Sequence, residues 1–171
     1  MDIFIEKLVD RKKDGKDILI ITGVIFLTVL LSFIVLVNFM YLNMFGPLII
    51  AALIWACYIV VSSRSVEFEY SLTNNELDVD KIISRRKRKR VVTVDARKIE
   101  IFAPVLRERF ARDTGNIKKT YRCDGNRNPD GTYFVVFFEK DGGKSALIFE
   151  PNEKMIDGFR RYNPSKVQTT L

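Results

Sequence analysis

Residues 18–61 contain no charged side chain, although the 171-residue chain carries 28 Lys and Arg residues and 21 Asp and Glu residues. The stretch consists of two apolar runs, Ile18–Phe39 and Phe45–Val61. A helix over the 22 residues of the first run is ~33 Å long at ~1.5 Å per residue, enough to cross a hydrocarbon core of ~30 Å. The second run has 17 residues, and the two serines that follow can extend it. We therefore predict a two-helix transmembrane hairpin over residues 17–63.

Two other interpretations of the apolar runs fit the sequence less well. A secretory signal peptide has a shorter apolar stretch and a small-residue cleavage site, whereas here a second apolar run follows directly. A buried helical hairpin of a soluble protein needs much more chain around it, because two helices that are apolar on all sides must be covered completely. We therefore retain the membrane hairpin.

Basic residues around the runs predict the orientation of the hairpin. The connection, roughly residues 40–44, is short and uncharged, so the outer ends of both helices lie on the same side. The cations on that side are Arg11, Lys12, Lys13, Lys16 and Arg64. Segments rich in Lys and Arg next to a membrane helix stay in the cytoplasm. We therefore predict a multi-pass protein of the cell membrane with both termini in the cytoplasm.

The N-terminal segment, residues 1–16, combines apolar and basic residues. Ile5, Leu8 and Val9 have helical spacing, and a basic run follows them. One interpretation is an amphipathic helix that lies on the inner leaflet. A frayed tail, or a helix that packs on the soluble domain, fits the same pattern, so the three alternatives stay open.

Beyond Arg64 the apolar residues alternate with polar ones, which is typical of half-buried strands. This criterion predicts strands near residues 66–72, 77–83, 91–94, 98–105, 132–140 and 144–150. A helix is expected from Pro151, because Met155, Ile156, Phe159 and Tyr162 form one apolar stripe before Asn163 and Pro164 end it. The predicted order is a four-strand meander, a polar insertion over 106–131, a two-strand hairpin and one helix.

Antiparallel strands followed by a single helix favour a curved sheet or a partly open barrel that the helix closes at one end. The predicted fold class is therefore α+β, with the transmembrane hairpin followed by an antiparallel sheet and a C-terminal helix. The soluble domain is expected over residues 64–164 and a loose tail over 165–171.

Four stretches carry a resemblance to a known family. They are MDIFIEKLV (1–9), YSLTNNELDVDKIISRRKRKR (70–90), KIEIFAPV (98–105) and FEPNEKMIDGFRRYNPSKV (149–167). The chain resembles the pleckstrin-homology-like domains of bacterial membrane proteins, and in particular a family of small membrane proteins known as a domain of unknown function. The resemblance spans nearly the whole chain. It implies a domain that binds lipids, peptides or proteins, but it brings no catalytic residues, and a fold alone does not define a function.

The strongest polar feature is a run of six cations, called the basic run below: Arg85, Arg86, Lys87, Arg88, Lys89 and Arg90. As the tip of a hairpin, it would bind anionic lipid headgroups, to which each residue contributes about 1 kcal/mol. The alternatives are a solvated hairpin that only sets topology, or contact with a protein. Nucleic acid is not expected, because no aromatic residues for base stacking interleave with the run.

The other polar residues suggest less specific chemistry. The insertion carries Arg107, Arg109, Arg112, Lys118, Lys119 and Arg122, which either extend a basic face or belong to a loop. Glu67, Glu69, Asp78 and Asp80 either pair with Lys and Arg across the sheet or bind a divalent cation, and pairing is the commoner outcome.

The sequence also excludes some classes of site. The chain contains no His, which excludes His-based catalysis and His metal ligands. Cys57 and Cys123 have no metal-like spacing and are not expected to form a disulfide. No nucleophile motif or phosphate-binding glycine loop stands out, so we predict neither an enzyme nor a cofactor.

The sequence thus predicts a non-catalytic, membrane-anchored module that binds anionic lipids or a protein partner at the cytoplasmic face. The alternative is a structural subunit of a membrane complex, or a homo-oligomer, assembled through the hairpin. The small residues Gly46, Ala51, Ala52 and Ala56 would allow close helix packing in that case.

Overall fold

The structure is a computed structural model that describes residues 4–42, 44–105, 110, 115, 117–125, 131–139 and 142–168. The chain forms two compact units. The helical unit consists of residues 13–66 together with residues 83–85, and the β unit contains the remaining residues. The predicted insertion residues Arg107, Arg109 and Arg112 lie outside the described residues.

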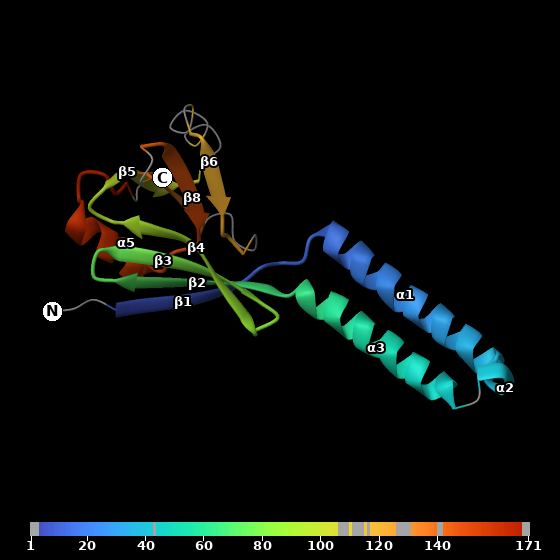
Figure 1. Cartoon of the computed structure of the whole chain (residues 1–171). Helices are drawn as coiled ribbons and strands as arrows, with labels where there is room; N and C mark the ends of the chain where they lie inside the picture. Colours follow the sequence, from blue (N-terminus) through green and yellow to red (C-terminus); the bar gives the residue numbers. More distant parts are fainter. Residues whose placement is uncertain are drawn as a thin grey trace. The chain divides into compact units, whose positions relative to one another are not determined.

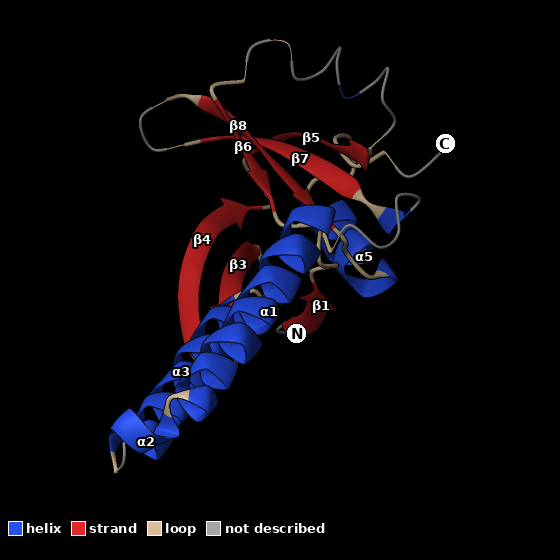
Figure 2. Ribbon diagram, turned by 90° about the vertical axis from the view of Figure 1, so that its right-hand side faces the viewer, coloured by secondary structure: helices blue, strands red, loops and turns tan. Residues whose placement is uncertain are grey.

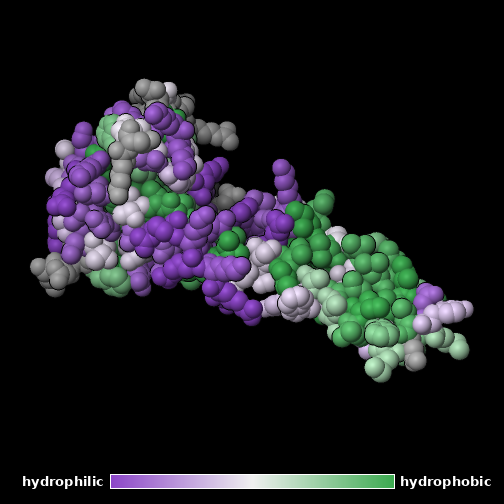
Figure 3. Space-filling view, in the orientation of Figure 1, coloured by the Kyte–Doolittle hydropathy of each residue, from purple (hydrophilic) through white to green (hydrophobic). Residues whose placement is uncertain are grey.

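The helical unit contains the two predicted apolar helices. They are α1 (Gly15–Val37) and α3 (Phe45–Ser63), with the one-turn α2 (Phe39–Leu42) in the connection between them (Figure 1). Both helices are long and apolar enough to cross a membrane, and only 6% of each apolar window is buried. Figure 3 shows apolar side chains covering the visible face of both helices. Large side chains such as Phe26, Phe33 and Trp55 are more than half exposed.

Close packing at one end and an ion pair at the other link α1 to α3. Gly46 is buried at the start of α3, where an added Cβ atom would lie 3.2 Å from the Phe39 ring and 3.8 Å from Val35. At the opposite end, the Arg64 guanidinium lies 3.8 Å from the Asp17 carboxylate. The charged residues thus gather at the end where the chain enters and leaves the helix pair.

The β unit begins with a strand that sequence analysis missed. Residues 4–10 form β1 (Phe4–Asp10), which pairs antiparallel with β2 (Val66–Thr73) from Phe4 opposite Thr73 to Asp10 opposite Glu67. None of the three interpretations left open for this segment, an amphipathic helix, a frayed tail or a helix packed on the soluble domain, describes residues 4–10. Ile5 and Val9 fit helical spacing, but they also fit the alternation of a strand, and pairing with β2 decides between the two.

The side chains of β1 alternate between the two faces of the sheet. Val9 is buried, whereas Phe4 and Leu8 are 64% and 55% exposed. Lys7 points inward with Val9, and its ammonium donates a hydrogen bond to the Glu150 carbonyl at 2.9 Å. The strand is therefore fixed by the buried face as well as by backbone pairing.

The first sheet has the order β1-β2-β3-β4 (Figure 1), and the second, whose strands are labelled in Figure 2, has the order β5-β7-β8-β6. The remaining strands are β3 (Glu76–Ile83), β4 (Lys87–Asp95), β5 (Ile99–Pro104), β6 (Lys119–Arg122), β7 (Tyr133–Phe138) and β8 (Lys144–Phe149). The predicted four-strand meander is only partly correct, because β5 pairs with β7 in the second sheet and β1 takes the fourth place in the first. The predicted hairpin of β7 and β8 is confirmed.

The predicted polar insertion also contributes to the fold. Its residues 119–122 form β6, which pairs parallel to β8. Phe110 packs edge-on against Phe134, with ring centroids 5.3 Å apart, and Ile117 joins the same apolar cluster on the outer face of the second sheet. Phe110 and Ile117 therefore pack on this face, which explains why β7 is apolar on both sides.

The main core lies beneath α5 (Glu153–Tyr162), which follows the second sheet. Phe159 of α5 packs against Phe102 and Phe149, with ring centroids 5.0 and 6.5 Å away, and Tyr70 of the first sheet packs edge-on against Phe149. Asn152 caps the helix by accepting a hydrogen bond from the Met155 amide at 2.8 Å. The predicted C-terminal helix and its apolar stripe are confirmed.

The segment after α5 is not the loose tail that the sequence predicts. The Phe102 amide donates to the Lys166 carbonyl at 3.0 Å, and the Gln168 amide donates to the Phe102 carbonyl at 2.8 Å. Val167 thereby forms a parallel bridge with Phe102 and is buried. Residues 166–168 therefore extend the edge of the second sheet, and 169–171 lie outside the described residues.

Substitutions on the two faces of β1 test its register. Val9→Ala should lower the free energy of unfolding by about 2 kcal/mol, because it removes buried methyl groups and leaves a cavity. Leu8→Ala should change it by less than about 0.5 kcal/mol, because Leu8 is exposed. Thermal unfolding of the full chain in mild detergent, followed by the β-sheet circular dichroism signal, measures both. Equal effects would favour a helix, in which both residues share one face.

Candidate functional site

The basic run does not form a single hairpin tip. Arg85 and Arg86 lie in the turn between β3 and β4, whereas Lys87 to Arg90 are already part of β4. The strand begins four residues earlier than the expected start at Val91. Because side chains alternate along a strand, the last four cations are divided between its two faces.

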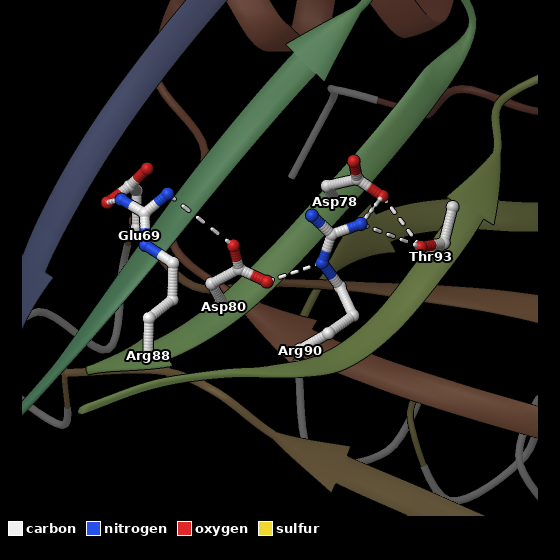
Figure 4. A network of polar contacts seen from close by, with 6 residues as sticks. All are labelled: Glu69, Asp78, Asp80, Arg88, Arg90 and Thr93. Atoms are coloured by element: carbon white, nitrogen blue, oxygen red, sulfur yellow. Dashed lines mark hydrogen bonds and ion pairs between the residues drawn. The ribbon is translucent and has the colours of Figure 1, made fainter. Parts of the chain in front are cut away.

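Arg88 and Arg90 belong to a network of ion pairs on the first sheet (Figure 4). Arg88 pairs with Glu69 of β2 and lies 3.9 Å from Asp80 of β3. Arg90 pairs with Asp80 through its Nε atom and with Asp78 at 2.6 Å. The predicted pairing of the acidic residues with cations across the sheet is therefore confirmed for Glu69, Asp78 and Asp80.

The network is more than a set of exposed surface pairs. The Asp80 side chain is only 10% exposed and that of Glu69 only 15%. Hydrogen bonding to Asp80 raises the pKa of Arg90, despite its partial desolvation. The Thr93 hydroxyl donates a further bond to Asp78 at 2.6 Å. These carboxylates bind arginine, and the described residues contain no group of three His, Cys, Asp or Glu placed to hold a metal ion.

The other four cations of the run remain at the surface. Lys87 and Lys89 alternate with the paired arginines along β4 and are exposed, as are Arg85 and Arg86 in the turn. Six cations face three carboxylates in this region, so a charge of 6 − 3 = +3 remains. Arg88 and Arg90 are therefore ion-paired within the sheet although their side chains are 57% and 51% exposed, whereas Lys87 and Lys89 lie outside these ion pairs.

The turn that carries Arg85 is bonded to the end of α3. The Ser84 hydroxyl donates to the Ser62 carbonyl at 2.6 Å, and the Ser84 amide donates to the Ser65 carbonyl at 2.9 Å. Ser84 and Arg85 have φ angles of 56° and 54°, a left-handed conformation that is unfavourable for residues other than glycine. Sequence reasoning missed Ser84, because its partners lie 19 and 22 residues away and no local motif marks it.

The described cations of the insertion have local partners or are dispersed. Lys119 lies over the Tyr121 ring, 4.4 Å from its centroid, and Arg122 lies 3.5 Å from the Asp124 carboxylate. Lys118 is exposed beside them. These residues precede or belong to β6 rather than the basic run, so the structure gives no support for one continuous basic face.

Two potentially reactive side chains of the β unit, Cys123 and Tyr70, are buried. Burial raises the pKa of the Cys123 thiol to about 12, so it stays protonated at neutral pH. Burial also raises the pKa of Tyr70, whose hydroxyl donates a hydrogen bond to the Cys123 carbonyl. Both side chains are therefore part of the buried core.

The fold defines a class of protein: an open β structure of two sheets with a C-terminal helix, joined to a pair of apolar helices. The β unit matches a pleckstrin-homology-like domain, and the two helices are long and apolar enough to cross a membrane. The chain belongs to the family described as Bacterial PH-like domain (DUF6106), whose model matches residues 1–169. The family predicted from the sequence is thus confirmed. No curated protein and no solved structure matches the chain.

A pair of substitutions separates the two parts of the basic run. Arg90→Gln should lower the free energy of unfolding by about 1–3 kcal/mol, because it leaves the largely buried Asp80 carboxylate without its charged donor. Lys89→Gln should cost less than about 0.5 kcal/mol, because Lys89 is exposed. Urea unfolding of the full chain in neutral detergent measures both. An equal loss of stability in the Arg90→Gln and Lys89→Gln variants would contradict the assignment of Arg90, and not Lys89, to the ion-pair network.

Proposed function

We propose that this protein is a non-catalytic membrane-anchored module. In this proposal the helical hairpin spans the cell membrane, both termini lie in the cytoplasm, and the basic run binds anionic lipid headgroups of the inner leaflet. The ligand chemistry is that of a negatively charged glycerophospholipid. A protein partner at the same face would be the other class of ligand for a pleckstrin-homology-like fold.

The membrane part of the proposal is supported by the surface of α1 and α3. Their large apolar side chains are exposed on all sides, a state that lipid tolerates and water does not. The charged residues at the ends of this unit are concentrated where the chain enters α1 and leaves α3, and the opposite connection is uncharged. The positive-inside rule then favours a cytoplasmic position for that charged end.

The observation that carries the lipid-binding part is the bonding of Ser84 to the end of α3. Ser84 donates to the carbonyls of Ser62 and Ser65, the last residues before β2 begins. If α3 spans the bilayer, its end lies at headgroup level, and the start of the basic run is held there. The two hydrogen bonds of Ser84 offset the cost of the left-handed conformation of Ser84 and Arg85.

Electrostatics supports the same assignment. Exposed Lys and Arg residues near an anionic leaflet contribute about 1 kcal/mol each, and the effect decays within a Debye length. Arg85, Arg86, Lys87 and Lys89 are exposed for this role. Because the hairpin already anchors the chain, their contacts would set the orientation of the β unit more than its affinity for the membrane.

The proposal of a non-catalytic role rests on the fold family and on the side chains. Pleckstrin-homology-like domains generally bind rather than catalyse, although fold alone does not decide the matter. The Cys123 thiol is buried and protonated, and the acidic groups of the first sheet are engaged by arginines. These observations favour a binding surface over a reaction centre.

Neutralising only the accessible cations tests lipid binding without breaking the ion pairs. The variant with Gln at positions 85, 86, 87 and 89 should bind phosphatidylglycerol at least tenfold more weakly than the unmodified chain, because at least ~1.4 kcal/mol of headgroup attraction is lost. Native mass spectrometry of the full chain in neutral detergent, titrated with the lipid, measures the affinity.

A matched control removes four exposed cations elsewhere, with Gln at positions 98, 118, 154 and 161. Its affinity for phosphatidylglycerol should remain within about twofold of that of the unmodified chain. If both quadruple variants bind the lipid equally well, the basic run does not bind headgroups. If the variant with Gln at positions 85, 86, 87 and 89 keeps its affinity for phosphatidylglycerol and the same proteins co-purify with it, the structural-subunit alternative described below is favoured.

The orientation has its own test. A reporter fused after Leu171 that is active only in the cytoplasm should give full signal, because the basic flanks keep both ends of the hairpin inside. A reporter active only outside the cytoplasm, fused at the same position, serves as the control and should be silent. The reverse pattern would overturn the orientation.

The alternative function is a structural subunit assembled through the hairpin, and one observation favours it. Of the four small residues on α3, Gly46 is used inside the hairpin against Phe39, whereas Ala51, Ala52 and Ala56 are exposed. Small residues on a lipid-facing surface allow a second helix to approach closely. Such packing could coexist with lipid binding, since it uses a different part of the chain.

A further inference from the structure

Strand β1 is an edge of the first sheet. It pairs with β2 on one side, and in the described part of the chain no strand lies on its other side, as Figure 1 shows at the border of the β unit. No backbone hydrogen bond among the described residues joins residues 4–8 to a segment other than β2. Such an edge presents alternate N–H and C=O groups that can pair with another extended chain.

The free part of this edge ends near Asp10. An added Cβ atom at Gly125 would lie 2.6 Å from Val9 and 2.9 Å from the Asp10 carbonyl oxygen, and the Lys12 amide donates to the Gly125 carbonyl at 2.8 Å. Gly125 therefore closes the end of β1 that leads into α1. The open part is residues 4–8, which span about 17 Å at a rise of ~3.4 Å per residue.

The outward face of the open part carries two large apolar side chains. Phe4 and Leu8 are 64% and 55% exposed, and the exposed Glu6 lies between them on the same face. Edge strands are commonly protected by lysine, but Lys7 points inward and donates to the Glu150 carbonyl at 2.9 Å. An exposed edge with apolar side chains is a surface suited to strand pairing.

A second β1 strand fits this edge poorly. In antiparallel pairing, the register that sets Phe4 opposite Leu8 of a second copy also sets the two Glu6 carboxylates opposite each other. Like charges placed directly opposite destabilise neighbouring strands. The charge of Glu6 instead favours a strand that carries a cation at this position.

The basic edge strand β4 of a second copy meets the charge requirement but not the geometry. Strands twist by about 20° from one to the next, so a sheet continued through a second set of four strands rotates that copy by about 80° and displaces it along the sheet. Two hairpins related in this way cannot both span one bilayer. This step rests on the membrane-spanning part of the proposed function.

We propose that residues 4–8 bind an extended segment of a partner protein, which adds to the first sheet as a fifth strand. Backbone hydrogen bonds to the free edge hold the segment. On its outward face the segment carries a basic residue opposite Glu6 and apolar residues opposite Phe4 and Leu8, because opposite charges and apolar pairs stabilise neighbouring strands. The inference goes beyond lipid binding, since the surface is β1 and not the basic run.

Two peptides that differ in one charge test the assignment. The probe is acetyl-TVTKTVT-amide, in which lysine and both valines lie on one face of a strand, and the comparison is acetyl-TVTETVT-amide. The full chain in neutral detergent should bind the lysine peptide at least about fivefold more tightly. Glu6→Lys should reverse this preference, whereas Glu153→Lys, an exposed position on α5, should leave it unchanged. The same preference in Glu6→Lys and in the unmodified chain would overturn the proposal.

The apolar contacts and the strand pairing have separate readouts. Phe4→Ser combined with Leu8→Ser should weaken both peptides, whereas Phe138→Ser, at a side chain that is 52% exposed, should weaken neither. Binding of the lysine peptide should slow amide hydrogen exchange at alternate residues of 4–8, because only every second N–H group faces the free edge. Unchanged exchange there would show that the peptide does not add as a strand.

Oligomeric state and lipid affinity separate this inference from the others. If native mass spectrometry shows dimers of the unmodified chain that the combined Phe4→Ser and Leu8→Ser variant lacks, the edge binds a second copy and the partner segment is wrong. The variant with Gln at positions 85, 86, 87 and 89 should bind both peptides like the unmodified chain. If that variant loses phosphatidylglycerol while the unmodified chain binds neither peptide, the proposed function stands and this inference fails.

Discussion

The pairing of β1 with β2 is the constraint on which the rest of the structure depends. It joins residues 4–10 to residues 67–73, so the whole apolar hairpin lies within the connection between two neighbouring antiparallel strands. Most such connections have two to five residues, whereas this one comprises residues 11–65. The helical hairpin is therefore an insertion into the β unit, connected to it through residues 11–14 and 64–65, and the turn residues 83–85 between β3 and β4 belong to the helical unit as well. A hairpin that precedes its domain in the chain would have only one such attachment.

The second organising interaction is the ion-pair network of the first sheet. Arg88 and Arg90 pair with three carboxylates, of which those of Glu69 and Asp80 are only 15% and 10% exposed, and these pairs offset part of the positive charge that the run presents to a ligand. Alternation along β4 leaves Lys87 and Lys89 outside the network. One basic segment thus contributes both to the stability of the sheet and to the charge of the surface, through different residues.

The sequence predicts the elements that depend on local patterns. The apolar helices, the hairpin of β7 and β8, and α5 with its apolar stripe all follow from spacing and composition. The errors occur where distant residues decide the outcome. Residues 4–10 fit either a helix or a strand until β2 is available as a partner, and β6 is recognisable only beside β8. The sequence predicts that the strand starts at Val91, but β4 begins at Lys87, because Arg88 and Arg90 pair with acidic residues of β2 and β3.

The sequence predicts the candidate site only in part, because distant residues decide its arrangement as well. The charge of the basic run is visible in the sequence, but its division is not, because it depends on which carboxylates lie opposite Arg88 and Arg90. The hydrogen bonds of Ser84 to the carbonyls of Ser62 and Ser65 are not visible in the sequence either, because they exist only in the folded helical unit.

The insertion of the hairpin between β1 and β2 has a consequence for biogenesis. β1 is synthesised before both apolar helices, but its partner β2 is synthesised after them. If the helices span a bilayer, β1 and β2 reach the same compartment only when both helices have crossed. A chain with one helix inserted would separate the two strands by the membrane and leave the first sheet incomplete, with the buried face of Val9 unfilled. The first sheet can therefore form completely only in a correctly inserted chain. A misinserted chain would expose an unpaired strand to quality-control proteases.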